Sequence, residues 1–145
     1  MAGIDGALSE LIDEFDLLGD WEERYRYVIE LGKTLEPLTD AERTDAHKVR
    51  GCASQVWLVT EPQADRTVRF RGDSDAHIVS GLIAILLRLY SGRTPAEILN
   101  FDAKAAFEAL GLSGALSSQR SNGLAAMVGR IRRDAEALSH QVDGA

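Results

Sequence analysis

The chain has 145 residues, a formal net charge of −7 and a single cysteine, Cys52. This length fits one domain that buries a core without disulfides or metals, and one cysteine excludes an internal disulfide. We therefore expect a single domain over residues 1–145, with flexible ends at the first few residues and after about residue 139.

The charge distribution argues against nucleic acid as a partner. Residues 1–72 hold 15 acidic and 9 basic side chains, and residues 73–145 hold 8 and 7. Nucleic-acid binding depends on clustered Lys and Arg, which this sequence lacks. The N-terminus has no targeting signature, and the longest apolar stretch, Ile78 to Leu89, is too short to span a membrane. We expect a soluble, cytoplasmic and monomeric protein.

The first part of the chain predicts two amphipathic helices. Apolar residues recur at helical spacing from Ile4 to Leu18, and Gly19 marks the end of that helix. The second helix begins with the capping pair Asp20 and Glu23. Its apolar stripe is expected to face the core, and the stripe consists of Trp21, Tyr25, Val28, Ile29 and Leu35.

The middle of the chain predicts a small sheet. After Pro37 ends the second helix, β-branched and aromatic residues predict strands at Gln55 to Glu61 and Arg66 to Arg71. Alternation in the second strand predicts one packed and one solvated face. Because a sheet of two strands alone is only marginally stable, we expect a third strand near Lys48. The predicted fold class is α+β, with helices packed on an antiparallel sheet of about three strands.

The next helix, over residues 76–90, is predicted to be the buried centre of the domain. It is apolar on most sides. One of the polar residues at positions 73–75 is expected to cap its N-terminus. Within it, Gly81 allows another backbone to pack closely, at a cost of about 1 kcal/mol in helix propensity.

Three further helices are predicted in the last third of the chain. Thr94 and Asp102 are expected to cap two short helices, the second of which stops at Gly111. The last helix is predicted to begin between Ser118 and Ser121 and to keep its apolar period until about Leu138.

Any covalent sulfur chemistry in this chain depends on Cys52. A free thiol with a pKa of about 8.5 is mostly protonated at neutral pH, and only the thiolate is a good nucleophile. Lys48 and Arg50 are close to Cys52 in sequence, and Gly51 permits the positive φ of a tight loop. Unpaired cysteines are also among the most often buried residues, so a packing role is the alternative.

The sequence offers few residues that could support other kinds of cysteine chemistry. A hydrolase needs a general base, for which His47 and His77 are candidates, but no signature of that chemistry surrounds Cys52. A zinc or Fe–S site needs about four closely spaced ligands, whereas one Cys and three scattered His are present. No lysine has a recognisable Schiff-base setting for PLP. We expect no metal or cofactor of the protein's own.

Several segments between about Trp21 and Leu138 form an ordered set: Trp21-Glu-Glu-Arg-Tyr25, Ile29-Glu-Leu-Gly32, Gly51-Cys-Ala-Ser-Gln-Val-Trp57, Gly72-Asp-Ser-Asp-Ala-His-Ile-Val79, Gly81-Leu-Ile, Thr94-Pro95, Asn100-Phe-Asp102 and Arg120-Ser-Asn-Gly-Leu-Ala-Ala-Met127. In their wording and order, these segments together resemble the SufE family of sulfur-acceptor proteins. The sequence departs from the family at His77, where a small residue is commoner, and in 116–120, which lacks a frequent proline.

The resemblance implies a SufE/NifU-like fold and a role in iron–sulfur cluster assembly. The protein would activate a SufS-like cysteine desulfurase, take its sulfane sulfur as a persulfide on Cys52, and pass it to a scaffold of the SufB type. It would act as a carrier with that enzyme, which would bring the PLP, rather than as an independent enzyme. Supporting roles would fall to Gly51, Arg50, Arg120 and Asp75, with Arg120 near the cysteine loop.

Two alternatives stay open at this point. The protein could be a docking module that regulates a desulfurase without covalent transfer, or a cysteine-dependent hydrolase. The carrier role makes a further structural prediction, because exposed persulfides are lost to oxidants and stray thiols. We expect a mobile loop at Gly51 and Cys52 with a small pocket beneath it.

Overall fold

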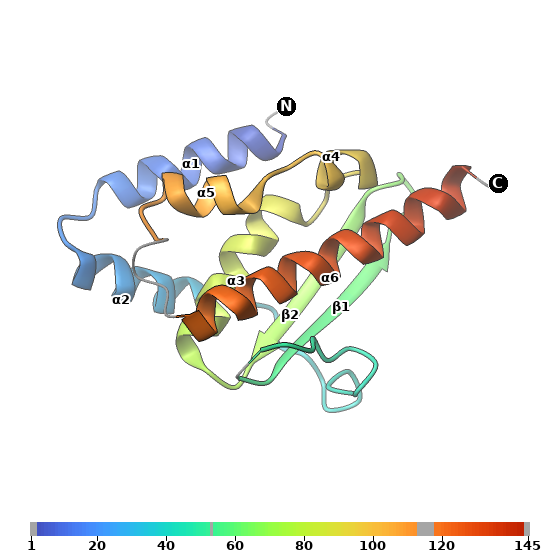
Figure 1. The fold of residues 1–145 in the computed structure, drawn as a ribbon, viewed down its shortest axis with the longest axis horizontal. Coiled ribbons are helices and arrows are strands. Elements are labelled where there is room, and N and C mark those ends of the chain that lie inside the picture. The colour runs from blue at the N-terminus through green and yellow to red at the C-terminus, as the bar shows by residue number, and fades with distance from the viewer. Residues whose placement is uncertain (1–2, 53, 113–117, 144–145) are drawn as a thin grey trace.

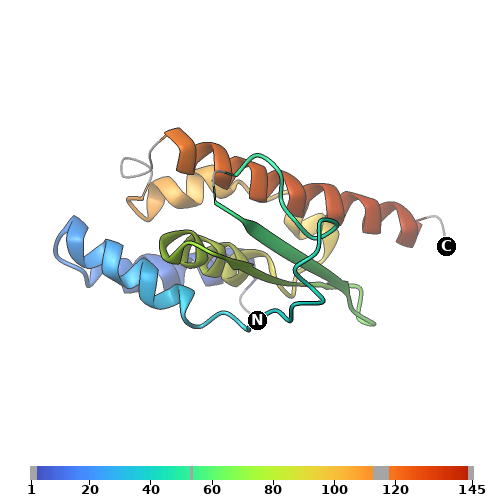
Figure 2. The same ribbon diagram turned by 90° about the horizontal axis from the view of Figure 1, so that it is seen from below.

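The computed structural model describes residues 3–52, 54–112 and 118–143, and this part of the chain folds as helices around a two-stranded sheet (Figure 1). The elements, in chain order, are α1 (Ile4–Asp16), α2 (Trp21–Gly32), β1 (Val56–Pro62), β2 (Val68–Ser74), α3 (His77–Tyr90), α4 (Pro95–Leu99), α5 (Ala103–Ala109) and α6 (Ser118–Asp143). In Figure 2, α6 runs along one side of the molecule and α1 and α2 along the other, with the strands between them. The predicted α+β class is confirmed.

The sheet has two full strands instead of the predicted three. β1 and β2 pair antiparallel, with Val56 opposite Ser74. The expected third strand is reduced to one bridge between Lys48 and Trp57. Hydrogen-bonded turns occupy residues 39–48, and the φ of +92° at Gly51 turns the chain away on the other side. Pairing therefore cannot extend in either direction.

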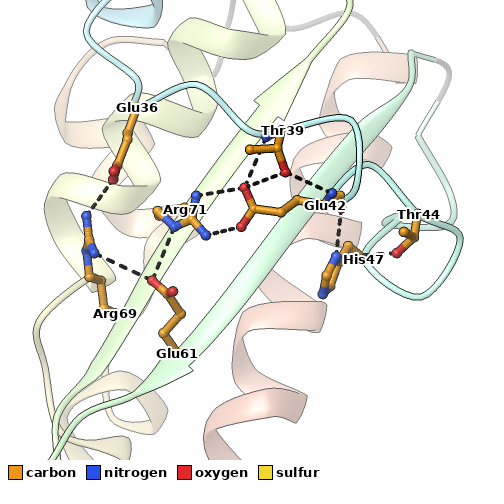
Figure 3. Close-up of polar contacts among 8 residues, drawn as sticks. All are labelled: Glu36, Thr39, Glu42, Thr44, His47, Glu61, Arg69 and Arg71. Atoms are coloured by element: carbon orange, nitrogen blue, oxygen red, sulfur yellow. Dashed lines mark hydrogen bonds and ion pairs between the residues drawn. The ribbon is translucent and has the colours of Figure 1, made fainter.

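The two faces of the sheet differ as the alternation predicted. Val68 and Phe70 are buried in the core, whereas Arg69 and Arg71 lie on the opposite face. There they meet carboxylates of the connection between α2 and β1 (Figure 3). Arg71 binds Glu42 and, with a 3.2 Å contact from its Nε, the carboxylate of Glu61. This polar network fixes the segment that leads into the cysteine loop.

The core centres on α3, as expected. Its residues 81–86, Leu89 and Tyr90 are all buried. A Cβ added to Gly81 would lie 2.0 Å from the carbonyl oxygen of Val28, and one added to Gly32 would lie 2.7 Å from the amide nitrogen of Gly81. The missing side chains therefore allow α2 and α3 to pack backbone against backbone.

Three of the helix caps are where the sequence placed them. The side chain of Asp20 accepts a hydrogen bond from the Glu23 amide, Thr94 forms a complete capping box with Glu97, and Asp102 accepts from the Ala105 amide. The last helix, however, continues to Asp143 instead of ending near residue 138. The flexibility of the ends stays a prediction.

The expected apolar stripe of α2 is only partly right: Val28 belongs to the core and Leu35 packs against it, whereas Trp21, Tyr25 and Ile29 are not among the described core residues. Val28 is 1% exposed, whereas Trp21, the first residue of α2, is 44% exposed. The Trp21 ring instead packs edge-on against Tyr25, with 6.1 Å between the ring centroids.

Candidate functional site

Cys52 lies in a short loop between the Lys48 bridge and the start of β1. The loop is closed at its base because the Val49 amide donates to the carbonyl of Val56 at 2.8 Å. Gly51 adopts a left-handed conformation, and a Cβ on it would lie 3.3 Å from the Cβ of Ala126 in α6. The loop therefore rests on α6, and glycine at position 51 permits both the turn and the contact.

The thiol of Cys52 is half-buried against the N-terminal part of α6. Its Sγ donates a weak hydrogen bond to the carbonyl oxygen of Gly123 at 3.5 Å. A Cβ on Gly123 would lie 3.7 Å from this sulfur. A methyl group there would therefore make an ordinary van der Waals contact with the thiol.

A pocket of about 220 Å³ lies beside the thiol. Its walls are mostly apolar and come from the cysteine loop, the start of α3 and the start of α6. The described residues that line it are Cys52, Ser54, Ala76, Ile78, Val79, Leu82, Arg120, Gly123, Leu124 and Met127. The expectation of a small pocket at the cysteine is confirmed, and the mobility of the loop stays a prediction.

Burial in this setting raises the pKa of the Cys52 thiol, because a thiolate loses hydration there. The resting protein thus holds a thiol that is mostly neutral at pH 7. Arg120, in the first turn of α6, is the basic side chain among the described residues of the pocket wall. A guanidinium and a helix N-terminus both favour a negative charge on sulfur. Arg50 is exposed and is not among the described residues of this wall.

Asp75 has a different contact from the one predicted for it as a helix cap. The N-cap of α3 is Ala76, without a side-chain hydrogen bond. The carboxylate of Asp75 instead accepts from the backbone amide of Gln55 at 3.0 Å, and Ser74 Oγ donates to the carbonyl of Gln55 at 2.7 Å. These bonds fix the chain three residues after Cys52, because Gln55 presents both of its backbone groups to this corner.

The histidines are not gathered at the thiol in the part of the chain that the structure describes. His47 hydrogen-bonds through Nδ1 to the carbonyl oxygen of Glu42 at 2.7 Å (Figure 3). His77 is exposed at the first residue of α3, and neither histidine is among the described residues of the pocket wall. Across the described residues, no group of three or more His, Cys, Asp or Glu side chains is arranged to hold a metal.

Of the ten described residues that line the pocket, only Cys52 and Arg120 were predicted as site residues, and two of the missed ones show why. Gly123 accepts the thiol hydrogen bond and Met127 closes the apolar wall. Glycine inside a predicted helix costs about 1 kcal/mol relative to alanine, which singles out Gly123 in the sequence, although an added Cβ there would make only ordinary van der Waals contacts with Cys52. Met127 carried no signal, because its spacing is that of any core-facing residue.

The fold and the site together define a small α+β protein that holds one half-buried thiol beside an apolar pocket. Residues 9–135 match the family described as the SufE Fe–S metabolism associated domain. The chain belongs to the SufE family, and with it to proteins associated with iron–sulfur metabolism.

Two relatives agree with that assignment, and one solved structure has a similar fold. The chain is 56% identical over 133 residues to an uncharacterized SufE-like protein of Rhizobium etli, covering 90% of each chain. It is 51% identical to another of Rhizobium meliloti, covering 90% of this chain and 95% of the relative. The fold is similar to the solution structure of a hypothetical protein from Thermus thermophilus, with a TM-score of 0.74, 18% identity, and coverage of 91% of this chain and 95% of that one. In the described residues, no helix is long and apolar enough to cross a membrane.

Proposed function

We propose that this protein is the sulfur acceptor and activator of a SufS-like cysteine desulfurase. Cys52 takes the sulfane sulfur as a persulfide and delivers it to an Fe–S assembly scaffold of the SufB type. The desulfurase supplies PLP and cleaves cysteine, whereas this protein carries the product. Membership of the SufE family supports a role in iron–sulfur metabolism, and the geometry around Cys52 supports sulfur transfer through its thiol.

The observation that carries the proposal is the pocket of about 220 Å³ beside the half-buried thiol. A water molecule takes about 30 Å³ of liquid volume, and one sulfur atom is of similar size. The pocket can therefore accept the extra sulfur of a persulfide without repacking. Its apolar wall, which includes Val79 and Leu82, limits the access of water-borne oxidants to that sulfur.

The transfer is a thiol exchange in which no net oxidation occurs. The Cys52 thiolate attacks the outer sulfur of the persulfide on the desulfurase cysteine. A sulfur–sulfur bond forms to Cys52, the bond within the donor persulfide breaks, and the desulfurase cysteine leaves as a thiolate. An acceptor thiolate on the scaffold then attacks the outer sulfur on Cys52 in the same way, and Cys52 leaves as a thiolate.

The resting site opposes the first step, because the raised pKa of Cys52 leaves little thiolate. Docking on the desulfurase must therefore draw the thiol out of its apolar contact or bring positive charge to it. Arg120 stands at the pocket and can stabilise both the thiolate and the persulfide anion. Gly51 gives the loop the backbone freedom that this displacement needs.

The experiment separates acceptance of sulfur from activation of the enzyme. Cysteine turnover by a SufS-like desulfurase is measured with wild-type protein, with Cys52→Ser and with the control Ser9→Ala, which changes an exposed serine of α1. We expect Cys52→Ser to bind the enzyme but to lose stimulation and sulfur uptake, while Ser9→Ala retains both. Full stimulation by Cys52→Ser would contradict the carrier function and favour a docking module.

A further inference from the structure

Arg130, on α6, holds the segment that enters the cysteine loop. Its Nη2 donates to the carbonyl oxygen of Ala46 at 2.9 Å and its Nη1 to that of Lys48 at 3.3 Å. The guanidinium thus bonds two backbone carbonyls just upstream of Cys52. Its side chain is 23% exposed; the bond to Lys48 is partly buried, and the bond to Ala46 is exposed.

The two carbonyls are available because of how this segment meets β1. The carbonyl of His47 accepts from the Leu58 amide and the Val49 amide donates to the carbonyl of Val56, each at 2.8 Å. Residues 45–47 form a turn, and Lys48 makes only a single bridge to β1. The carbonyls of Ala46 and Lys48, on either side of His47, accept from Arg130, so the guanidinium binds this segment where no further strand pairs with it.

Two other residues hold the guanidinium in this position. Its Nε lies 3.3 Å from both carboxylate oxygens of Asp134, one helical turn further along α6. Asp134 Oδ2 also accepts a hydrogen bond from Thr60 Oγ1 of β1 at 2.7 Å. The chain of contacts from Thr60 through Asp134 to Arg130 joins the sheet, α6 and the loop entrance.

We infer that Arg130 is a positioning residue for sulfur acceptance, an inference that rests on the proposed function of Cys52. Arg130 fixes the upstream end of the cysteine loop, and the bonds of Gln55 with Asp75 and Ser74 fix the downstream end. Movement on docking is then confined to the short loop between residues 49 and 55. The thiol leaves its contact with Gly123 along a restricted path and still returns to the same pocket.

Loss of Arg130 releases one end of this loop while the pocket residues stay in place. The thiol is then less sheltered in the free protein, and it meets the donor persulfide less often in the right geometry. Charge-assisted hydrogen bonds on a partly exposed loop support a change of roughly threefold to tenfold in the population of open conformers. The rate of Cys52 alkylation in the free protein should therefore rise, and the rate of sulfur uptake from the desulfurase should fall.

The test compares Arg130→Met, Arg130→Lys and the control Arg133→Met, which removes the same charge from an exposed position on the same helix. The rate of Cys52 alkylation by iodoacetamide is measured in the free protein, and sulfur uptake is measured with a SufS-like desulfurase and cysteine. The thermal unfolding midpoint shows whether each variant is folded. Arg130→Lys keeps the charge without the fork, so it tests the inference even if Arg130→Met does not fold.

We expect Arg130→Met to be alkylated about threefold to tenfold faster than the wild type and to take up sulfur more slowly, with Arg130→Lys between them and Arg133→Met unchanged. A folded Arg130 variant with wild-type values in both assays would overturn the positioning role and leave the function of Cys52 standing. If the wild type takes up no sulfur while Arg130→Met is still alkylated faster, the proposed function is refuted and the contact of Arg130 with the loop stands. Slower or unchanged alkylation together with slower uptake would refute the positioning role.

Discussion

Replacement of Gly81 by alanine tests the scaffold that presents the cysteine. A Cβ at this position would lie 2.0 Å from the carbonyl oxygen of Val28, 2.6 Å from its carbonyl carbon and 2.6 Å from its Cγ1. Two of these three atoms belong to the backbone of α2, so no side-chain rotation can relieve the overlap. The helices α2 and α3 must separate along their contact.

The size of the effect follows from three terms. Overpacking of a tight contact costs about 1–3 kcal/mol, and a clash with backbone lies at the upper end of this range or above it. Separation also weakens dispersion, because a gap of about 0.5–1 Å already loses a quarter to a half of a contact's energy. Alanine returns about 1 kcal/mol through its helix propensity. We therefore expect Gly81→Ala to lower the free energy of unfolding by about 2 kcal/mol or more.

Urea unfolding, followed by circular dichroism, measures this difference. With a typical slope of about 1–3 kcal/mol per molar urea, the expected loss moves the midpoint by roughly 1 M. Gly129→Ala is the matched control, because the nearest atom to its added Cβ is the flexible end of Arg133 at 3.7 Å. The control should gain up to about 1 kcal/mol. Equal midpoints for Gly81→Ala and the wild type would refute the close packing of α2 on α3.

Two further predictions concern single polar groups. Hydrogen bonds from Arg71 lower the pKa of Glu42 to about 2, so this carboxylate stabilises the fold above about pH 4.5 and loses that effect as pH falls towards 2. Glu42→Gln should therefore be less stable than the wild type at neutral pH, with a difference that shrinks through this window in urea titrations; a difference independent of pH would contradict the ion pair. Tyr90 buries a hydroxyl that has no hydrogen-bond partner among the described residues, so Tyr90→Phe should retain or raise stability by up to about 1 kcal/mol. A loss of more than about 1 kcal/mol in thermal unfolding would reveal a partner of that hydroxyl.

Local signals in the sequence predicted the elements well. Asp20, Thr94 and Asp102 cap helices because their side chains satisfy amides within the next three residues, so the pattern contains all the partners. The same rule was wrong for α3. Asp75 bonds the amide of Gln55, twenty positions earlier in the chain, and a local pattern cannot rank that contact against a cap.

The features of the candidate site also differ in whether a local sequence signal could predict them. Cys52 and Gly51 are visible in sequence because cysteine chemistry and positive φ are properties of single residues. The raised pKa of the thiol and the pocket beside it arise from contact with α6, which lies about seventy residues later. Arg130 gave no signal of its contact with the loop entrance, because the two groups that it binds there are backbone carbonyls and any residue type supplies those.

The intact mass of the protein after incubation with a SufS-like desulfurase and cysteine tests the central claim most directly. The account predicts that the wild type gains the mass of one sulfur atom, that a reductant removes it, and that Cys52→Ser gains nothing under the same conditions. An unchanged wild-type mass, in a reaction where the desulfurase is bound and turning over, would contradict the persulfide on Cys52.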